Sequence, residues 1–125
     1  MNYSISEAEW KIMQILWKNS DITLSDIVAQ LTDSQWSYST IKTLLKRLAD
    51  KNVVLVDKSV RNTFRYSPAI LAQDCKMNEA NSFLKKVFDG SVPTFLATFL
   101  QDKKLSQKEL NELQEMISKE VLKND

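Results

Sequence analysis

The stretch from Trp36 to Leu48 carries the residue types best suited to contact a nucleic acid. At about 100° per residue, its apolar side chains fall on one stripe of an amphipathic helix. That stripe contains Ile41, Leu44, Leu45 and Leu48. The opposite side is mostly hydroxyls and amines and contains Ser39, Lys42, Thr43, Lys46 and Asp50, flanked by Thr40 and Arg47. Such groups bond base edges and phosphate oxygens, which suits a DNA major groove. An ordinary solvated face is the alternative.

Positive charge is concentrated on the same third of the chain, although the net charge of the 125 residues is only +1. Residues 39–66 contain seven Lys and Arg against two Asp, a net charge of +5. Residues 1–38 carry −3 and residues 67–125 carry −1. A contiguous basic third is the electrostatic footprint of a phosphate-binding surface. The charge pattern therefore favours DNA binding over the solvated face.

Several function classes lack the residues they need. The sequence has no His, no glycine-rich phosphate loop and no cluster of metal-ligand residues, and Cys75 is its one cysteine. General-base, zinc and nucleotide chemistry therefore lack their usual groups, so we expect no enzyme, no cofactor and no metal site. No apolar run approaches the roughly 18 residues of a membrane helix, and no export signal is present. We expect a cytoplasmic protein with no membrane partner.

Local signals predict three helices and then a β-hairpin in residues 1–66. The Ser6–Glu9 and Thr23–Asp26 segments each form a capping box at the start of a helix. The third helix is the segment described above. Residues 53–56 and 63–66 are rich in β-branched and aromatic side chains and are predicted strands. This order is typical of a winged helix-turn-helix domain, so the predicted fold is mainly α with a small hairpin.

The predicted hairpin is marginal on its own and must pack on the helices. We expect its apolar side chains to point inward, namely Val54, Val56, Phe64 and Tyr66. We expect its basic side chains to face solvent or phosphate, namely Lys58, Arg61 and Arg65.

Residues 67–125 are predicted to form three further helices. The Ser67–Pro68 pair has the residue types of a helix N-cap and first turn, and the helix it begins is expected to end near Asp89. A short helix is predicted after Pro93, and the Ser106–Glu109 capping box opens the last one. We interpret these helices as a dimerisation unit.

The apolar stripes of this second half are too large for it to bury alone. They contain Phe83, Leu84, Val87, Phe88, Phe95, Leu96, Phe99, Leu100, Leu110, Leu113, Ile117 and Val121. A unit of under about 60 residues buries too little of its own surface to hide them. A second copy of the chain is the simplest partner, because a reader of symmetric DNA needs two copies. Packing back onto the first helix of a monomer is the alternative.

Four blocks of the sequence resemble a known family: Ile5–Trp17, Trp36–Leu48, Phe64–Tyr66 and Phe83–Leu84. They are similar to the penicillinase and copper-transport repressors of Gram-positive bacteria, the BlaI/MecI/CopY family, over nearly the whole chain. The resemblance implies a winged helix that reads a palindromic operator with TACA/TGTA half-sites, followed by a helical dimerisation unit. It makes Ser39–Arg47 the recognition helix.

Two departures from that family leave the inducing signal open. Its copper repressors end in a Cys-x-Cys-x4-Cys-x-Cys metal site, whereas this chain ends without a thiol nearby. Its penicillinase repressors are inactivated by cleavage of an Asn-Phe bond in the dimerisation helices. The matching pair here is Thr98–Phe99, in which only Phe99 agrees. A sensor protease is therefore a candidate partner, and the sequence leaves open whether one acts on this chain.

The leading hypothesis is a sequence-specific repressor with domains 1–66 for DNA and 67–125 for homodimerisation, acting on resistance or metal-homeostasis genes. We expect Ser39, Lys42 and Thr43 to contact base edges. We expect Thr40, Lys46 and Arg47 to contact base edges or phosphates. The basic residues of the hairpin are expected to contact phosphates, namely Lys58, Arg61 and Arg65. Trp36 and Tyr38 are interpreted as structural rather than as base-stacking groups. The alternative is a winged-helix protein–protein adaptor without specific DNA readout.

Overall fold

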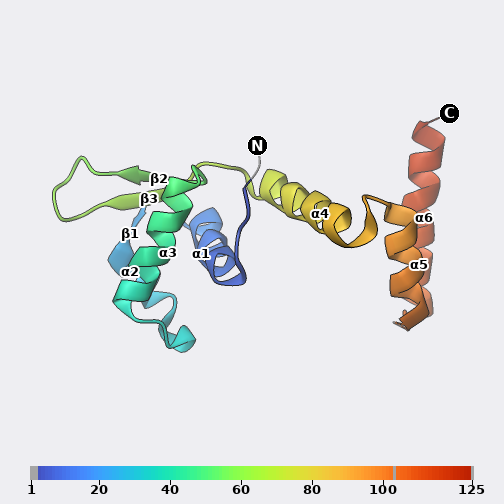
Figure 1. Ribbon diagram of the computed structural model, residues 1–125, viewed down its shortest axis with the longest axis horizontal. Helices are drawn as coiled ribbons and strands as arrows, with labels where there is room; N and C mark the ends of the chain where they lie inside the picture. The colour runs from blue at the N-terminus through green and yellow to red at the C-terminus, as the bar shows by residue number, and fades with distance from the viewer. Residues whose placement is uncertain (1–2, 103, 125) are drawn as a thin grey trace. The chain divides into compact units, whose positions relative to one another are not determined.

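The computed structural model describes residues 3–102 and 104–124 as two units, Met1–Asn81 and Ser82–Asp125 (Figure 1). The first unit contains α1 (Glu7–Lys18), β1 (Ile22–Thr23), α2 (Leu24–Ala29), the 3-10 helix η1 (Thr32–Ser34), α3 (Tyr38–Asp50), β2 (Val54–Asp57) and β3 (Arg65–Pro68). Helix α4 (Ala72–Phe88) begins in the first unit, and the second adds α5 (Val92–Asp102) and α6 (Gln107–Lys123). The predicted functional division into 1–66 and 67–125 stays a prediction.

All three predicted capping boxes are present, so the helices start where the sequence indicated. At α1, the Ser6 hydroxyl accepts from the Glu9 amide at 3.1 Å, and the Glu9 carboxylate accepts from the Ser6 amide at 2.9 Å. The same reciprocal pattern begins α2 at Thr23 and α6 at Ser106. Each box satisfies two amide donors that the first helical turn leaves without partners.

The core of the first unit lies where α1, α2, α3 and the sheet meet. Its fully buried side chains come from every one of these helices and from the chain before β2: Ile12, Met13, Leu16, Ile27, Ile41, Leu45, Leu48 and Val53. Each aliphatic side chain of this kind contributes about 1.5–3 kcal/mol when removed from water. Burial of the α1 and α3 stripes against one another therefore holds the three helices and the sheet together.

The sheet has three antiparallel strands in the order β1-β3-β2, one strand more than the predicted hairpin. In the register, Tyr66 of β3 lies between Ile22 of β1 and Val56 of β2. Strand β1 is only two residues long, too short for its period-2 pattern to be recognised in the sequence. By joining β3, it ties the hairpin to the start of α2, since Thr23 also caps that helix.

Two predictions about the hairpin region were wrong. Ser67 and Pro68 do not begin a helix, because they belong to β3 and pair with Leu55 and Val54. Proline is tolerated there because Pro68 is the last residue of the strand. Phe64 does not point inward, because it precedes β3 and its side chain is exposed, whereas Val54 and Tyr66 are buried as expected.

Within the second unit, three phenylalanines pack around Phe95, two of them edge to face and Phe99 with a tilted ring. Its ring centroid lies 6.0 Å from that of Phe83, 5.3 Å from that of Phe88 and 5.9 Å from that of Phe99. Helix α4 ends before Asp89 and Gly90, both of which have a positive φ. None of the described residues of this unit is buried. Several of its apolar side chains are exposed, namely Phe83, Val87, Phe99, Leu100, Leu110, Ile117 and Val121.

A buried ion pair joins the beginning of α1 to the end of α3. The Lys51 ammonium lies 2.7 Å from one Glu9 carboxylate oxygen and 2.8 Å from the other. The Glu9 side chain is 3% exposed and that of Lys51 is 32% exposed. Burial by itself raises the pKa of the Glu9 carboxyl, but hydrogen bonds from Lys51 and Ser6 outweigh burial, and the net pKa is lowered from its ordinary value of 4.5.

We predict that Glu9→Gln destabilises the first unit by about 2 kcal/mol at pH 7. This loss is smaller than that expected on breaking a fully buried ion pair, because the Lys51 side chain is partly hydrated. Because the pKa of Glu9 is lowered by folding, the ionised carboxylate contributes its full stabilisation above pH 4.5. That stabilisation is lost as the pH falls through the pKa of Glu9 in the folded state. Urea unfolding followed by tryptophan fluorescence measures it, since Trp10, Trp17 and Trp36 all lie in the first unit.

The matched control is Glu7→Gln, which changes an exposed carboxylate in the same helical turn. It should alter the free energy of unfolding by less than about 0.5 kcal/mol. Equal destabilisation by the two variants, or a Glu9→Gln effect that persists unchanged at pH 3, contradicts the ion-pair explanation.

Candidate DNA interface

Helix α3 separates its buried and exposed sides as the sequence predicted. Ile41, Leu44, Leu45 and Leu48 are at most 5% exposed. Ser37 caps the helix, since its hydroxyl accepts from the Thr40 amide at 3.1 Å. The predicted contact residues of this helix are all exposed: Ser39, Thr40, Lys42, Thr43, Lys46 and Arg47. Burial of one stripe therefore presents a continuous polar surface on the other side.

Two side chains of this polar surface are held by bonds within the helix. The Thr43 hydroxyl donates to the Ser39 carbonyl oxygen at 3.0 Å, which orients its methyl and its remaining lone pair. The Lys46 ammonium lies 3.2 Å from an Asp50 carboxylate oxygen, and both side chains are exposed. An exposed pair of this kind contributes little stability and is easily exchanged for a phosphate. The polar surface is thus partly ordered before any ligand arrives.

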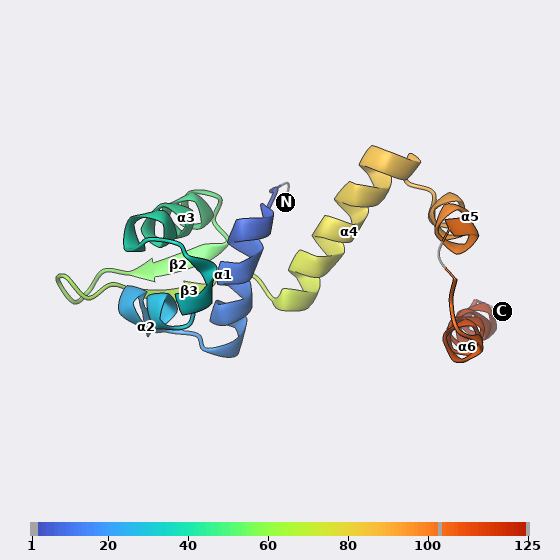
Figure 2. The same cartoon turned by 90° about the horizontal axis from the view of Figure 1, so that it is seen from below.

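The loop between β2 and β3 forms a wing that projects away from the helices (Figures 1 and 2). At its base, an Asp57 carboxylate oxygen accepts from the Ser59 amide at 2.9 Å. The Lys58 ammonium lies 5.7 Å from the centre of the Phe64 ring, a cation–π distance. Lys58 and Arg61 are both exposed. The wing therefore carries its positive charge on a loop anchored by a turn and an aromatic ring.

A groove of about 460 Å³ runs between α3 and the wing. Three lysines lie along it, Lys42 and Lys46 from α3 and Lys58 from the wing. The remaining lining residues are Thr43, Leu45, Ala49, Asp50, Val56, Phe64 and Tyr66. The groove brings together basic residues that are distant in the sequence, and the exposed Phe64 gives it an apolar wall. Such a surface suits a polyanion with sugar and base edges between its charges.

Arg65 is placed differently from the other predicted phosphate contacts. Its Nε donates to an Asp21 carboxylate oxygen at 3.3 Å, and its Nη2 donates to the Asp21 carbonyl oxygen at 2.9 Å. Asp21 has a positive φ of 59° and precedes β1. The pair thus clamps the turn before β1 to the central strand of the sheet. Sequence reasoning missed this contact because the two residues are far apart in the chain.

Tyr38 was also missed as a surface group. It is the first residue of α3 and is 55% exposed, so it is a surface residue and not the structural group that the sequence interpretation made it. Trp36 does have a structural role, because it packs against the core and the Lys11 ammonium lies 5.6 Å from its ring centre. An exposed aromatic ring at the entry to α3 adds an apolar contact to the polar surface.

Among residues 3–102 and 104–124, no group of three or more His, Cys, Asp or Glu is arranged to hold a metal ion. Cys75 is buried, and burial raises the pKa of its thiol, which disfavours the thiolate that binds soft metals. In the same described part of the chain, no helix has the length and apolar character needed to cross a membrane.

Comparison with known proteins decides the family. The family model described as "Penicillinase repressor" matches residues 5–119. The chain belongs to the penicillinase repressor family. It is 33% identical over 115 residues to a penicillinase repressor of Staphylococcus aureus, covering 91% of this chain and 90% of the relative. It is 31% identical over 119 residues to the methicillin resistance regulatory protein MecI of Staphylococcus aureus (strain N315), covering 94% and 95%.

A solved structure of the penicillinase repressor family supports the fold. The solution structure of the DNA binding domain of the repressor BlaI superimposes with a TM-score of 0.51 at 35% identity, covering 59% of this chain and 93% of that domain. The predicted winged-helix fold and family are therefore confirmed. As a member of the penicillinase repressor family, the chain is a DNA-binding transcriptional repressor and not an enzyme.

The capping role of Ser37 at the start of α3 can be tested directly. We expect Ser37→Ala to destabilise the first unit by about 1 kcal/mol, because the Thr40 amide loses its acceptor. The midpoint of urea unfolding by tryptophan fluorescence measures the change. Ser39→Ala, in the same helical turn but without a capping bond, serves as the control and should leave the midpoint nearly unchanged. Equal shifts for the two variants refute the capping role.

Proposed function

We propose that this repressor binds a palindromic operator as a homodimer, with α3 in the major groove and the wing along the adjacent phosphates. One observation carries the proposal: the exposed polar surface of α3 and the wing face each other across a groove with Lys42, Lys46 and Lys58 along it. Helices of this kind read base edges, whereas flanking cations set register and affinity. The family resemblance supplies TACA/TGTA as the expected half-sites.

Base readout is assigned to Ser39, Lys42 and Thr43. All three are exposed on α3, and the bond from the Thr43 hydroxyl to the Ser39 carbonyl oxygen holds the threonine side chain in one orientation. Lys42 donates to purine acceptors, and a threonine methyl packs on the thymine methyl. These contacts differ between base pairs, so they supply specificity.

Phosphate contacts are assigned to the basic side chains around that centre and to the Thr40 hydroxyl. Thr40, Lys46 and Arg47 contribute from α3, with Lys46 exchanging Asp50 for a phosphate. Lys58 and Arg61 contribute from the wing. Arg65 keeps Asp21 as its first partner, and its remaining N–H donors are available to a phosphate because the side chain is 42% exposed. These contacts are independent of sequence.

The homodimer is proposed to form through the apolar side chains of the second unit. Seven of the twelve predicted dimerisation residues are exposed, and Leu84, Phe88, Phe95, Leu96 and Leu113 are half-buried. A single protomer would leave this surface in water, whereas a symmetric partner covers it and supplies the second recognition helix. Packing of these stripes onto α1 remains the alternative outcome of the dimer test below.

Induction by a sensor protease is part of the same proposal, with Thr98–Phe99 as the cleavage site. The pair lies inside α5, where the Thr98 hydroxyl donates to the Thr94 carbonyl at 3.0 Å. A protease binds its substrate in extended form, so α5 has to unwind locally before cleavage. Resistance or metal-homeostasis genes are the proposed targets, and the cytoplasm is the proposed location.

We predict that Lys42→Ala and Thr43→Ala each weaken binding to the palindrome by about 5- to 150-fold and weaken binding to scrambled DNA less. Arg61→Ala should weaken both DNAs alike and lower the slope of log K against log salt by about 0.9. Fluorescence anisotropy with labelled duplexes across a salt series measures both effects.

Lys119→Ala, which removes an exposed lysine of α6, is the matched control and should bind like the parent protein. Equal losses on the two DNAs for Lys42→Ala would remove that residue from base readout. Binding that ignores salt would contradict the phosphate contacts. Absence of binding to either DNA would favour the protein–protein adaptor instead.

The dimer has its own test. Ile117 is 55% exposed on the predicted face of α6, so Ile117→Asp should leave the helices folded but bury a charge in the interface. We expect at least a hundredfold weaker dimer by sedimentation equilibrium, with an unchanged far-ultraviolet circular dichroism spectrum. Asn111→Asp, on another face of α6, should remain dimeric. A parent protein that sediments as a monomer at micromolar concentration overturns the proposed dimer.

A further inference from the structure

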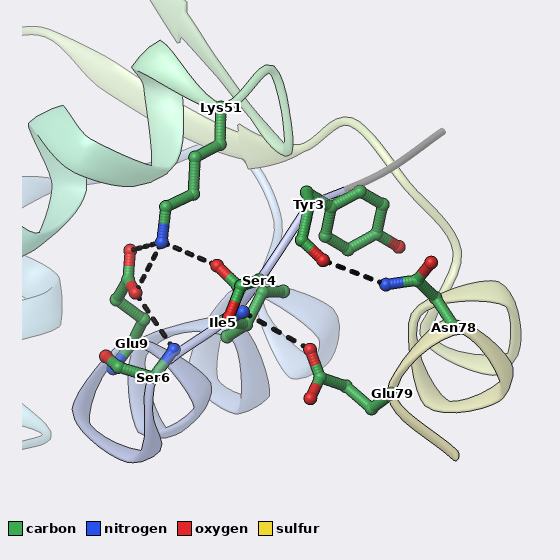
Figure 3. Close-up of polar contacts among 8 residues, drawn as sticks. All are labelled: Tyr3, Ser4, Ile5, Ser6, Glu9, Lys51, Asn78 and Glu79. Carbon is green, nitrogen blue, oxygen red and sulfur yellow. Dashed lines mark hydrogen bonds and ion pairs between the residues drawn. The ribbon is translucent and has the colours of Figure 1, made fainter. Parts of the chain in front are cut away.

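The segment before α1 bonds to two helices of the first unit at once (Figure 3). Residues 3–5 run between the end of α3 on one side and α4 on the other, and their backbone atoms make the contacts on both sides. We call this segment the strap. Its contacts come from Lys51 on the α3 side and from Asn78 and Glu79 on the α4 side.

On the α3 side, Lys51 connects the strap to the recognition helix. Lys51 is the C-cap residue of α3, and its ammonium donates to the Ser4 carbonyl oxygen at 2.6 Å. The same ammonium is held by both carboxylate oxygens of Glu9. The strap therefore moves with the end of the recognition helix and the start of α1.

On the α4 side, two neighbouring side chains hold the strap. The Glu79 carboxylate accepts from the Ile5 amide at 3.2 Å, and the Asn78 side-chain amide donates to the Tyr3 carbonyl oxygen at 3.1 Å. Ile5 is buried, and burial together with the neighbouring Cys75 thiol raises the pKa of Tyr3 to about 12. The strap is thus packed as well as hydrogen-bonded.

These contacts give α4 a second attachment to the winged helix. Its first attachment is at its start, through residues 69–71 that follow β3 and through the buried side chain of Cys75 in the first turn. Asn78 and Glu79 lie about 10 Å further along the helix axis, at about 1.5 Å per residue from Ala72. A helix held at one end can pivot, whereas a helix held at two separated points has a fixed direction. Helix α4 continues without interruption to Phe88.

We propose that the strap fixes the direction in which α4 leaves the winged helix, and that Asn78 and Glu79 are positioning residues for recognition of two half-sites. The inference rests on the proposed homodimer. A dimer gains affinity for a palindrome only when its second recognition helix arrives in phase with the second half-site. Loss of the strap contacts leaves each half-site contact intact but loosens the spacing that the dimer selects.

The test compares full-length variants on three kinds of DNA: a single half-site, the palindrome, and palindromes whose spacer is changed by one or two base pairs. We expect Asn78→Ala and Glu79→Ala to bind the single half-site like the parent protein. On the palindrome they should bind about tenfold more weakly, and their preference for the original spacer should fall by a similar factor. Fluorescence anisotropy gives all of these constants.

Two further variants separate positioning from general damage. Glu79→Gln keeps a side-chain oxygen that accepts from the Ile5 amide, so it should restore the parent spacing preference. Gln73→Ala changes an exposed residue of the same helix and should also behave like the parent protein. Tryptophan fluorescence checks folding of the first unit, and sedimentation checks the dimer.

An unchanged spacing preference in Asn78→Ala and Glu79→Ala overturns the strap proposal alone. Equal weakening on the half-site and the palindrome also overturns it, because the damage is then to the winged helix itself. If the parent protein binds the palindrome no better than the half-site, the proposed dimeric mode of binding fails, and the strap proposal fails with it.

Discussion

Burial of one stripe of α3 is the constraint on which the rest of the structure depends. Ile41, Leu44, Leu45 and Leu48 are almost completely removed from water, which contributes several kcal/mol and can be achieved in only one rotation of the helix. That rotation sends the hydroxyls and amines of the other side outward. The proposed DNA-reading surface is therefore a consequence of the core, and no separate interaction is needed to orient it.

Helix α1 provides the surface against which α3 is buried and also holds its end. Ile12 and Leu16 contribute to the shared core, while Glu9 both closes the capping box of α1 and binds Lys51 at the C-cap of α3. The sheet supports the wing, which is the second element of the proposed DNA interface. Strand β3 lies between β1 and β2, and Arg65 secures it to Asp21. The proposed recognition helix and the wing are thus supported by the same small core.

The features that local signals encode could be predicted from the sequence. The capping boxes at Ser6, Thr23 and Ser106 and the stripe of α3 depend on residues three or four positions apart, so a single sequence contains the whole signal. The winged-helix order followed from them. The polar face of α3 and the basic residues of the wing were identified for the same reason.

The features that were missed depend on contacts between distant segments. The two-residue β1 forms only because β3 lies beside it, and the pairing of β3 with β2 converts Ser67–Pro68 from an apparent helix start into strand. The partnership of Arg65 with Asp21 and the exposure of Phe64 and Tyr38 follow from the same tertiary arrangement. Neither periodicity nor charge counting contains that information.

The lack of buried residues among the described part of the second unit has a consequence for the amount of repressor in a cell. In the proposed dimer, pairing covers apolar side chains that a single protomer exposes, so the stability of this unit rises with protein concentration. Growth that dilutes the protein then promotes both dissociation and degradation of the loosened chains. Because dimer stability depends on protein concentration, promoter occupancy then falls more steeply than the protein concentration itself.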